Sequence, residues 1–304
     1  MFLYEKKRFR FFATLLQILN VVQWGNMRYQ KNGKLLNKEQ VSAEDRAFMY
    51  GDGCFTTARW SQGEIKLWAR HLQRFAHAFS ALALNCTIER IEHDLQHFLT
   101  HLTEYDYGTI KIVISRGVSA RGYALPEHDA DIYFYFYPAQ VQQQPTLIQS
   151  IGMLSEQLGS TLASLKGIKT LNRLEQVMLK HTAQKYGWVD ALCFDAHQHV
   201  VEAISSNCFF YLNDTWVTPD LELTGIQGTM RAELLERMAH YQIAHQVRII
   251  TASEIAHAQA LFLCNALQPM QMVETLVNQQ GEVISLDLQP CHQLFRRLSL
   301  SQLV

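Results

Sequence analysis

A short stretch rich in glutamine and proline, residues 138–145, divides this sequence into two parts with different patterns. It reads Pro-Ala-Gln-Val-Gln-Gln-Gln-Pro, which has almost no apolar side chain for a core element and is typical of a linker. The chain has 304 residues, enough for two domains of roughly 150 residues. We therefore expect an N-terminal domain over 27–138, a linker over 139–145 and a C-terminal domain over 146–304.

Before this stretch, helix-like and strand-like patterns alternate. Apolar residues recur at helical spacing within 69–83, which predicts an amphipathic helix, and a second helix is expected over 88–102. Segments rich in β-branched and aromatic residues predict strands over 54–60, 65–67, 109–114 and 131–137. The N-terminal domain should thus be α+β.

After this stretch, strand-like segments dominate. Strands are expected over 191–194, 200–204, 208–212, 216–218, 247–250 and 260–264. A helix should begin near Gly228 and run through Met238. Another helix is expected after residue 170, with one face traced by Leu171, Leu174, Val177, Met178 and His181. The fold class is therefore α+β, with a smaller α+β domain followed by a larger β-rich domain.

The balance of charge and the cysteine content exclude several kinds of protein. Lys and Arg total 27 against 28 for Asp and Glu, whereas a nucleic-acid binder usually carries a strongly basic face. The six cysteines show no zinc-type spacing, so we expect reduced, buried thiols in a cytoplasmic protein. His93, His97 and His101 lie four residues apart, but no carboxylate or cysteine joins them in a recognised pattern. A solvated helix face is therefore favoured over a metal site.

The first 26 residues differ from the rest. Basic residues between Lys6 and Arg10 precede an uncharged run over 11–27, which is the outline of a signal peptide. The run is shorter than the ~20 apolar residues of a membrane helix. Polar residues interrupt it, and no small-residue cleavage site follows. We expect a dispensable extension, with Met27 as the working start, rather than a signal or a membrane anchor.

Common catalytic motifs are absent from the sequence, and one lysine is more informative. There is no serine nucleophile elbow, P-loop or HExxH motif, and Gly51-Asp-Gly53 predicts only a tight turn. Lys169 lies between a short apolar run and the start of an amphipathic helix. Partial desolvation there would lower its pKa and make the amine a nucleophile for Schiff-base chemistry. The alternative is an ordinary surface lysine at a helix start.

Three neighbouring features favour the chemical interpretation. Glu202 is a carboxylate in an otherwise apolar strand and needs a buried partner. A protonated pyridine nitrogen would serve, because keeping that nitrogen charged strengthens pyridoxal phosphate as an electron sink. Residues 225–231 open a helix whose free N–H groups can seat a phosphate, and Arg74 could clamp it. Each feature alone has a structural explanation, but together they indicate a pyridoxal phosphate site.

The same residues carry a resemblance to a known family. The chain resembles fold-type IV pyridoxal phosphate enzymes, the class of the branched-chain and D-amino-acid aminotransferases, and within it the aminodeoxychorismate lyases. The matching residues are Asp45-Arg46, Tyr50-Gly-Asp-Gly-Cys-Phe-Thr-Thr-Ala-Arg59, His71-Leu-Gln-Arg74, Ile114-Ser-Arg-Gly117, Arg121-Gly-Tyr123, Gly167-Ile-Lys-Thr-Leu-Asn-Arg-Leu-Glu-Gln176, Glu202, Gly228-Thr-Met-Arg231 and Cys264-Asn-Ala-Leu267. They span residues 28–275 in the family's order. The resemblance implies two domains, the second pseudobarrel-like, and a homodimer.

The resemblance also implies roles at the cofactor. Lys169 would bind pyridoxal 5'-phosphate covalently and act in catalysis, and Glu202 would pair with the pyridine nitrogen. The phosphate would be held by Arg74, by the backbone amides of Thr229 and Met230, and by the corner at Asn265 and Ala266. Related aminotransferases carry a hydroxyl at this corner. Ala266 has none, so Asn265 or the main chain must replace it.

The reaction implied is the conversion of 4-amino-4-deoxychorismate to 4-aminobenzoate and pyruvate, a step of folate biosynthesis. Arg116, Arg121 and Tyr123 would bind the substrate, which carries two carboxylates. A D-amino-acid or branched-chain transaminase of the same fold is the alternative. Transaminases of this class commonly carry an aromatic residue and then Glu where this chain has Phe55-Thr56. That difference, with Asn172-Arg173 after the lysine, favours the lyase.

Overall fold

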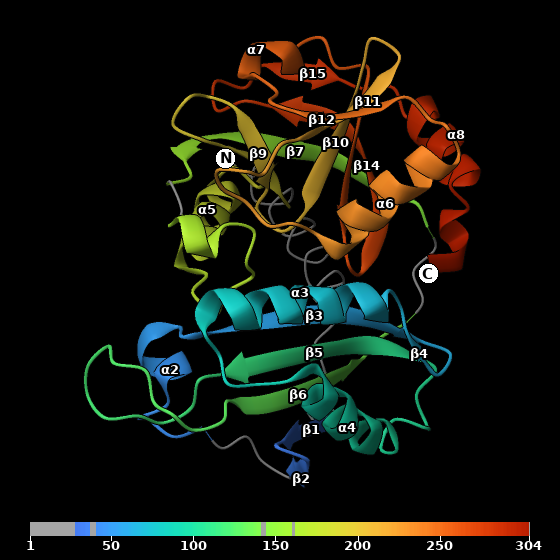
Figure 1. Ribbon diagram of the computed structural model, residues 1–304. Coiled ribbons are helices and arrows are strands. Elements are labelled where there is room, and N and C mark those ends of the chain that lie inside the picture. The colour runs from blue at the N-terminus through green and yellow to red at the C-terminus, as the bar shows by residue number, and fades with distance from the viewer. Residues whose placement is uncertain (1–27, 37–40, 141–143, 160–161, 304) are drawn as a thin grey trace, which may run out of the picture.

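The elements of the chain gather around two sheets, which lie one above the other in Figure 1. The computed structural model describes residues 28–36, 41–140, 144–159 and 162–303. The N-terminal extension expected over 1–26 and the middle of the expected linker, residues 141–143, lie outside the described residues. The first sheet ends at Pro138 and the second begins at Thr146.

The first sheet has six antiparallel strands in the order β2-β1-β6-β5-β3-β4. They are β1 (Arg28–Lys31), β2 (Lys34–Leu36), β3 (Gly53–Ser61), β4 (Glu64–Ile65), β5 (Tyr107–Ser115) and β6 (Asp131–Pro138). Burial alternates along β5, because every second side chain faces the helices that cover one side. Those helices are α3 (Trp68–Leu82) and α4 (Ile88–Leu99); a short helix, α2 (Arg46–Tyr50), precedes β3.

The second sheet has nine strands, eight of them in the order β12-β11-β10-β13-β14-β7-β8-β9, with β15 paired to β14. They are β7 (Thr146–Gln157), β8 (Ala191–Phe194), β9 (Val200–Ala203), β10 (Asn207–Leu212), β11 (Thr215–Pro219), β12 (His245–Arg248), β13 (Ala260–Asn265), β14 (Gln268–Val277) and β15 (Val283–Ser285). The pairs β11–β12, β14–β7 and β7–β8 are parallel. The sheet is therefore mixed.

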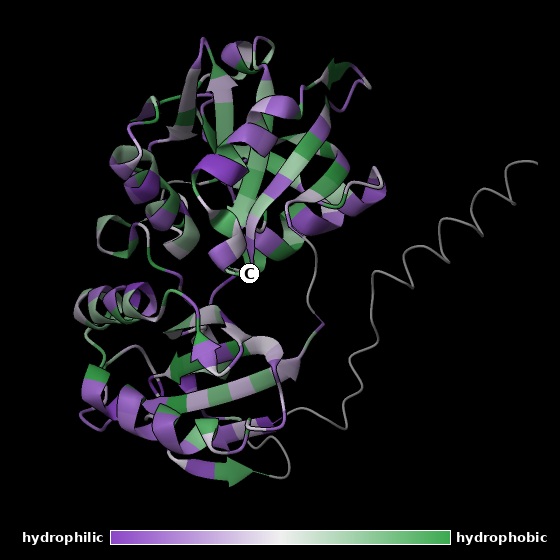
Figure 2. Cartoon of the chain, turned by 90° about the vertical axis from the view of Figure 1, so that its right-hand side faces the viewer, coloured by the Kyte–Doolittle hydropathy of each residue, from purple (hydrophilic) through white to green (hydrophobic). Residues whose placement is uncertain are grey.

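Central strands of the second sheet are buried on both faces. In β10, Phe210 packs into one core cluster and Phe209 into another beneath the outer helices. This explains the continuous apolar runs of these strands, which are visible as green ribbons in Figure 2. The helices of this part are α5 (Leu174–Lys185), α6 (Thr229–His240), α7 (Ala252–Ile255) and α8 (Gln289–Arg297). Short 3-10 turns occupy Ala163–Leu165 and Leu300–Leu303.

Most expected elements are present, and the exceptions have physical reasons. The predicted helices over 69–83 and 88–102 are confirmed as α3 and α4. The pattern analysis missed β7 and β14, because polar residues interrupt their apolar positions and their parallel pairing joins segments far apart in the chain. The helix after residue 170 is present as α5, but Leu174, Val177 and Met178 are exposed, and Leu179 and Ala183 are buried instead.

No helix in the described part of the chain is both long and apolar enough to cross a lipid bilayer.

Candidate active site

Lys169 lies where the two sheets meet. The backbone N–H of Phe55 in β3 donates to the Lys169 carbonyl at 3.0 Å, and the N–H of Leu171 donates to the Gly53 carbonyl at 3.0 Å. Gly53 leaves room for this approach, because a Cβ there would lie 2.8 Å from Leu171 Cδ1, and also 2.1 Å from the carbonyl oxygen of Ile114 on β5. The segment that carries the lysine is thus fixed against the edge of β3.

The Lys169 amine lies over an aromatic ring and has a lowered pKa. Its Nζ is 4.7 Å from the centre of the Phe55 ring. Burial, together with the nearby charges of Arg74 and Arg173, lowers the pKa of Lys169 to about 8, against a smaller opposing effect of Glu202. The amine therefore loses its proton much more readily than an ordinary lysine and can then act as a nucleophile or base.

Glu202 is a buried carboxylate on β9, the last strand in the order of the second sheet. Its side chain accepts the backbone N–H of Ile226 at 3.0 Å and lies 3.4 Å from the side-chain amide of Asn207. It forms no ion pair with any described residue. Burial raises the pKa of Glu202 to about 7, so the carboxylate lacks the cationic partner that a buried charge requires.

Arg74 and the start of α6 form a third feature with unused donors. The guanidinium donates to the Gln227 carbonyl at 2.9 Å and to Thr56 Oγ1 at 3.3 Å, and within the described chain it pairs with no carboxylate. Burial lowers the pKa of Arg74 to about 10. Beside it, α6 begins at Thr229, whose buried Oγ1 has no hydrogen-bond partner in the described structure. This corner is suited to an anion.

These three features line one cavity of about 850 Å³. Of the residues predicted for the cofactor, the cavity is lined by Lys169, Glu202, Arg74, Thr229, Asn265 and Ala266. The Met230 side chain is buried in the core beneath α6, so only its backbone is available to a ligand. The structure therefore brings together residues that lie as much as 192 positions apart in the sequence (Ala266 against Arg74).

The side chain of Asn265 is used within the fold. Its Oδ1 accepts the backbone N–H groups of Leu267 and Gln268, each at 3.0 Å, and its Nδ2 donates to Ser206 Oγ at 3.1 Å. Of the two substitutes expected for the missing hydroxyl at Ala266, the Asn265 side chain is thus occupied in shaping the turn. Main-chain groups are what this corner can present to a ligand.

Arg116, which the resemblance predicted to bind the substrate, instead makes contacts within the first domain. Its Nε donates to Asp52 Oδ2 at 2.8 Å, and its two Nη groups donate to the carbonyls of Ala83 and Leu82 at 2.8 and 2.6 Å. The side chain is almost fully buried and lines none of the cavities described here. We correct the expectation: Arg116 holds the end of α3 against the loop before β3.

Arg121 and Tyr123 lie on an exposed loop away from the cavity. Tyr123 is 84% exposed and packs against Tyr50, with ring centres 5.5 Å apart. Neither residue lines a cavity of this single chain.

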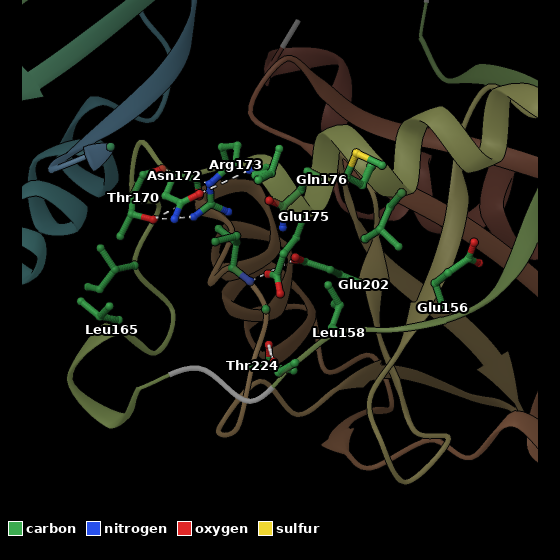
Figure 3. Close-up of a pocket in the computed structure, with 18 of the residues that line it drawn as sticks. Glu156, Leu158, Leu165, Thr170, Asn172, Arg173, Glu175, Gln176, Glu202 and Thr224 are labelled. Atoms are coloured by element: carbon green, nitrogen blue, oxygen red, sulfur yellow. Dashed lines mark hydrogen bonds between the residues drawn. The ribbon is translucent and has the colours of Figure 1, made fainter. Parts of the chain in front are cut away.

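Arg173, for which the sequence predicted no role at the site, lines two cavities. Its guanidinium donates to the Thr170 carbonyl at 3.0 Å and to Thr170 Oγ1 at 2.9 Å, as the dashed lines in Figure 3 show. Arg173 and Glu202 line both the cavity of Lys169 and a neighbouring one of about 910 Å³. The motif Asn172-Arg173 was a signal for the family, but only the fold shows that Arg173 faces the site.

His93 and His97 lie on α4, and His101 follows the end of that helix. His97 Nδ1 lies 3.0 Å from Gln30 Oε1, and its ring is 5.2 Å from that of His101. Within the described ranges, no group of three or more His, Cys, Asp or Glu side chains is placed to hold a metal ion.

The unused groups of the cavity fit pyridoxal phosphate. A free amine can bind its aldehyde, a buried carboxylate without a cation can pair with its ring nitrogen, and an arginine beside a helix N-terminus can bind its phosphate. The chain belongs to the class IV amino-transferase family, whose model matches residues 53–276. Its architecture is that of the fold-type IV enzymes, for which the family implies pyridoxal phosphate as cofactor.

Within this family, the chain is similar to lyases and to aminotransferases. The chain is 30% identical over 235 residues to the aminodeoxychorismate lyase of Vibrio harveyi, covering 76% of this chain and 86% of the relative. The structure of 4-amino-4-deoxychorismate lyase from Pseudomonas aeruginosa matches with a TM-score of 0.76 and 29% identity, covering 89% and 97%. D-alanine aminotransferase of Staphylococcus aureus strain N315 is 24% identical over 245 residues, covering 76% and 83%.

Proposed function

We propose that this protein is a pyridoxal phosphate-dependent lyase that converts 4-amino-4-deoxychorismate to 4-aminobenzoate and pyruvate. The observation that carries the proposal is the meeting of Lys169, Glu202 and Arg74 in one cavity, each without a compensating partner in the described chain. The similarity to two lyases at 30% and 29% identity supports the substrate.

In this proposal the cofactor's three ends meet three parts of the chain. Lys169 holds its aldehyde carbon, Glu202 pairs with its ring nitrogen, and Arg74 binds its phosphate. Thr229, the backbone of Met230, and main-chain groups at Asn265 and Ala266 complete the phosphate site. When bound, pyridoxal phosphate supplies an electron sink for the carbon next to the reacting amino group.

The chain's own contribution to the reaction is the movement of one proton. Lys169 Nζ, with its lowered pKa, takes the proton from the substrate carbon that bears nitrogen. The C–O bond to the enolpyruvyl group breaks, the ring becomes aromatic, and the leaving group gains a proton to become pyruvate. All atoms of the substrate appear in the two products, so no water or second substrate is consumed.

The substrate's carboxylates require cations, and we propose Arg121 with Tyr123 for this role. Because their loop lies away from the cavity of its own chain, it would have to reach the site of a second copy. Exposed apolar residues support a homodimer, since Phe48 and Met49 lie near this loop and Leu174, Val177 and Met178 lie on α5. We further propose a cytoplasmic location, as the cysteine content suggests.

The test is an absorption spectrum of the purified protein, followed by assay of 4-aminobenzoate formation. A yellow, lysine-bound cofactor with lyase turnover is the expected result. A D-amino-acid transaminase is the second candidate, favoured by the similarity to D-alanine aminotransferase. It would instead form a keto acid from an amino acid and convert the bound cofactor to its amine form. A colourless protein with neither activity would overturn both.

A further inference from the structure

Two fully buried side chains lie directly behind Arg74 and form a hydrogen-bonded chain with it. Thr56 faces α3 from β3, and His71 lies one turn before Arg74 on α3. Thr56 Oγ1 is 2.7 Å from His71 Nδ1, and Arg74 Nη1 donates to the same oxygen at 3.3 Å. Both Thr56 and His71 have no exposed surface. Solvent therefore cannot replace either contact.

In this network Arg74 is the cationic donor and His71 is uncharged. Burial lowers the pKa of His71 to about 3, and the charge of Arg74 contributes to the shift, so the ring is neutral near pH 7. Since Arg74 can only donate, Thr56 Oγ1 accepts from it, and the same oxygen is hydrogen-bonded to Nδ1 of the neutral ring in the direction that the ring's tautomer sets. The other ring nitrogen, Nε2, is buried and has no hydrogen-bond partner in the described structure. A buried polar atom without a hydrogen-bond partner costs stability.

These hydrogen bonds fix the orientation of the Arg74 guanidinium without neutralising its charge. Thr56 holds Nη1 and the Gln227 carbonyl holds Nη2, so both ends of the planar group are restrained. Both acceptors are uncharged, and the full charge of Arg74 remains for an anion at the start of α6. A carboxylate in place of Thr56 would compete with that anion for the same cation.

We propose that Thr56 and His71 are positioning residues that set Arg74 to bind the phosphate ester of the cofactor. This proposal rests on the proposed function, since it takes the cavity of Lys169 as the pyridoxal phosphate site. It assigns the Thr56 hydroxyl and His71 Nδ1 to the phosphate end of that site. Neither residue would affect the end that holds the ring and the aldehyde.

The test compares two ligands that differ only in the phosphate. The full chain, stripped of cofactor, is titrated with pyridoxal phosphate and with pyridoxal, and binding is followed by absorbance. Thr56→Val keeps the shape of the side chain and removes the hydroxyl. It should bind pyridoxal phosphate about tenfold more weakly and pyridoxal with unchanged affinity. Thr56→Ser restores the hydroxyl and should bind both ligands as the wild type does.

His71 supplies an independent pair of variants. His71→Asn can place a polar amide group near the position of Nδ1 and should keep most of the phosphate selectivity, whereas His71→Leu should lose it as Thr56→Val does. Ser61→Ala, which removes another buried hydroxyl from β3, is the matched control and should change neither affinity. If Thr56→Val does not fold, as judged by circular dichroism, Thr56→Ala is used for the same comparison.

Two outcomes overturn the proposal. In one, Thr56→Val and His71→Leu bind pyridoxal phosphate as tightly as the wild type. In the other, they lose affinity for pyridoxal and for pyridoxal phosphate equally, which would show a general effect on the fold. A wild-type chain that binds neither ligand would instead refute the cofactor site itself, so the two failures are distinguishable.

Discussion

Two groups of buried charges in this protein differ in how fully they are neutralised. In the first, which we term the saturated cluster, Arg46 and Arg116 both donate to Asp52, at 2.7 and 2.8 Å, and their remaining donors bind carbonyls and a serine. In the second, the open cluster of Lys169, Glu202 and Arg74, no member forms an ion pair with a described residue.

The pKa values reflect the same difference. Burial alone would raise the pKa of Asp52, but hydrogen bonds from Arg116 and Arg46 outweigh it and hold that pKa below its usual value. In the open cluster burial dominates: the amine and the guanidinium have lowered pKa values and the carboxyl has a raised one. The saturated cluster should therefore stabilise the fold, whereas the open cluster should weaken the empty protein and serve a ligand.

The strongest test of this contrast removes the amine of the open cluster. Lys169→Ala should lower turnover by about 10⁴-fold, because it removes both the cofactor's attachment point and the base. The melting temperature of the cofactor-free protein should stay equal or rise, since at pH 7 the folded state no longer holds a desolvated ammonium ion. Formation of 4-aminobenzoate and calorimetry measure the two effects. Turnover within tenfold of the wild type would refute the role of Lys169.

The converse test removes a member of the saturated cluster. Arg116→Met should lower the free energy of unfolding by about 4 kcal/mol, because it breaks a buried ion pair and leaves the carbonyls at the end of α3 without donors. Urea unfolding at pH 7 measures this loss. Affinity for pyridoxal phosphate in the folded fraction should not change. A raised KM with unaltered stability would instead restore Arg116 to the substrate.

Lys169, Glu202 and Arg116 also show what the sequence could and could not predict. Lys169 and Glu202 were recognisable because their signals are local: a lysine where an apolar run meets a helix, and a carboxylate inside an apolar strand. The role of Arg116 depends on the end of α3, more than thirty residues earlier in the chain, and no local pattern records that contact. For the same reason α3, α4 and α6 were predicted from their local patterns, while the parallel pair β7–β14 was missed.

Glu202 predicts a pH dependence of stability that belongs to the open cluster. Its pKa is about 7 in the fold against an ordinary value of 4.5, so the folded state retains this proton to a higher pH than the unfolded state. The contribution of this protonated carboxyl to the free energy of unfolding is therefore fully present below pH 4.5. It is lost as the pH rises to 7, which lowers the free energy of unfolding by about 3 kcal/mol. Glu202→Gln cannot ionise and should lack this loss.

The measurement is urea unfolding of both cofactor-free proteins at pH 5 and pH 7.5. The wild type should lose more stability between the two values than Glu202→Gln. An equal loss in both would mean that Glu202 is already compensated in the fold, and it would remove Glu202 from the open cluster.

Substitution of Arg74 should give the smallest of these effects. It should change the affinity for the cofactor while leaving the stability of the fold almost unchanged. Arg74→Met keeps much of the apolar stem of the side chain but removes the charge, so it should weaken pyridoxal phosphate binding by about 2 kcal/mol, or roughly thirtyfold in Kd. Pyridoxal, which lacks the phosphate, should bind with unchanged affinity. The free energy of unfolding of the empty protein should change little, because Arg74 has no carboxylate to leave unpaired. A loss of stability as large as that of Arg116→Met would show that Arg74 is a structural cation, and the distinction between the two clusters would fail at this residue.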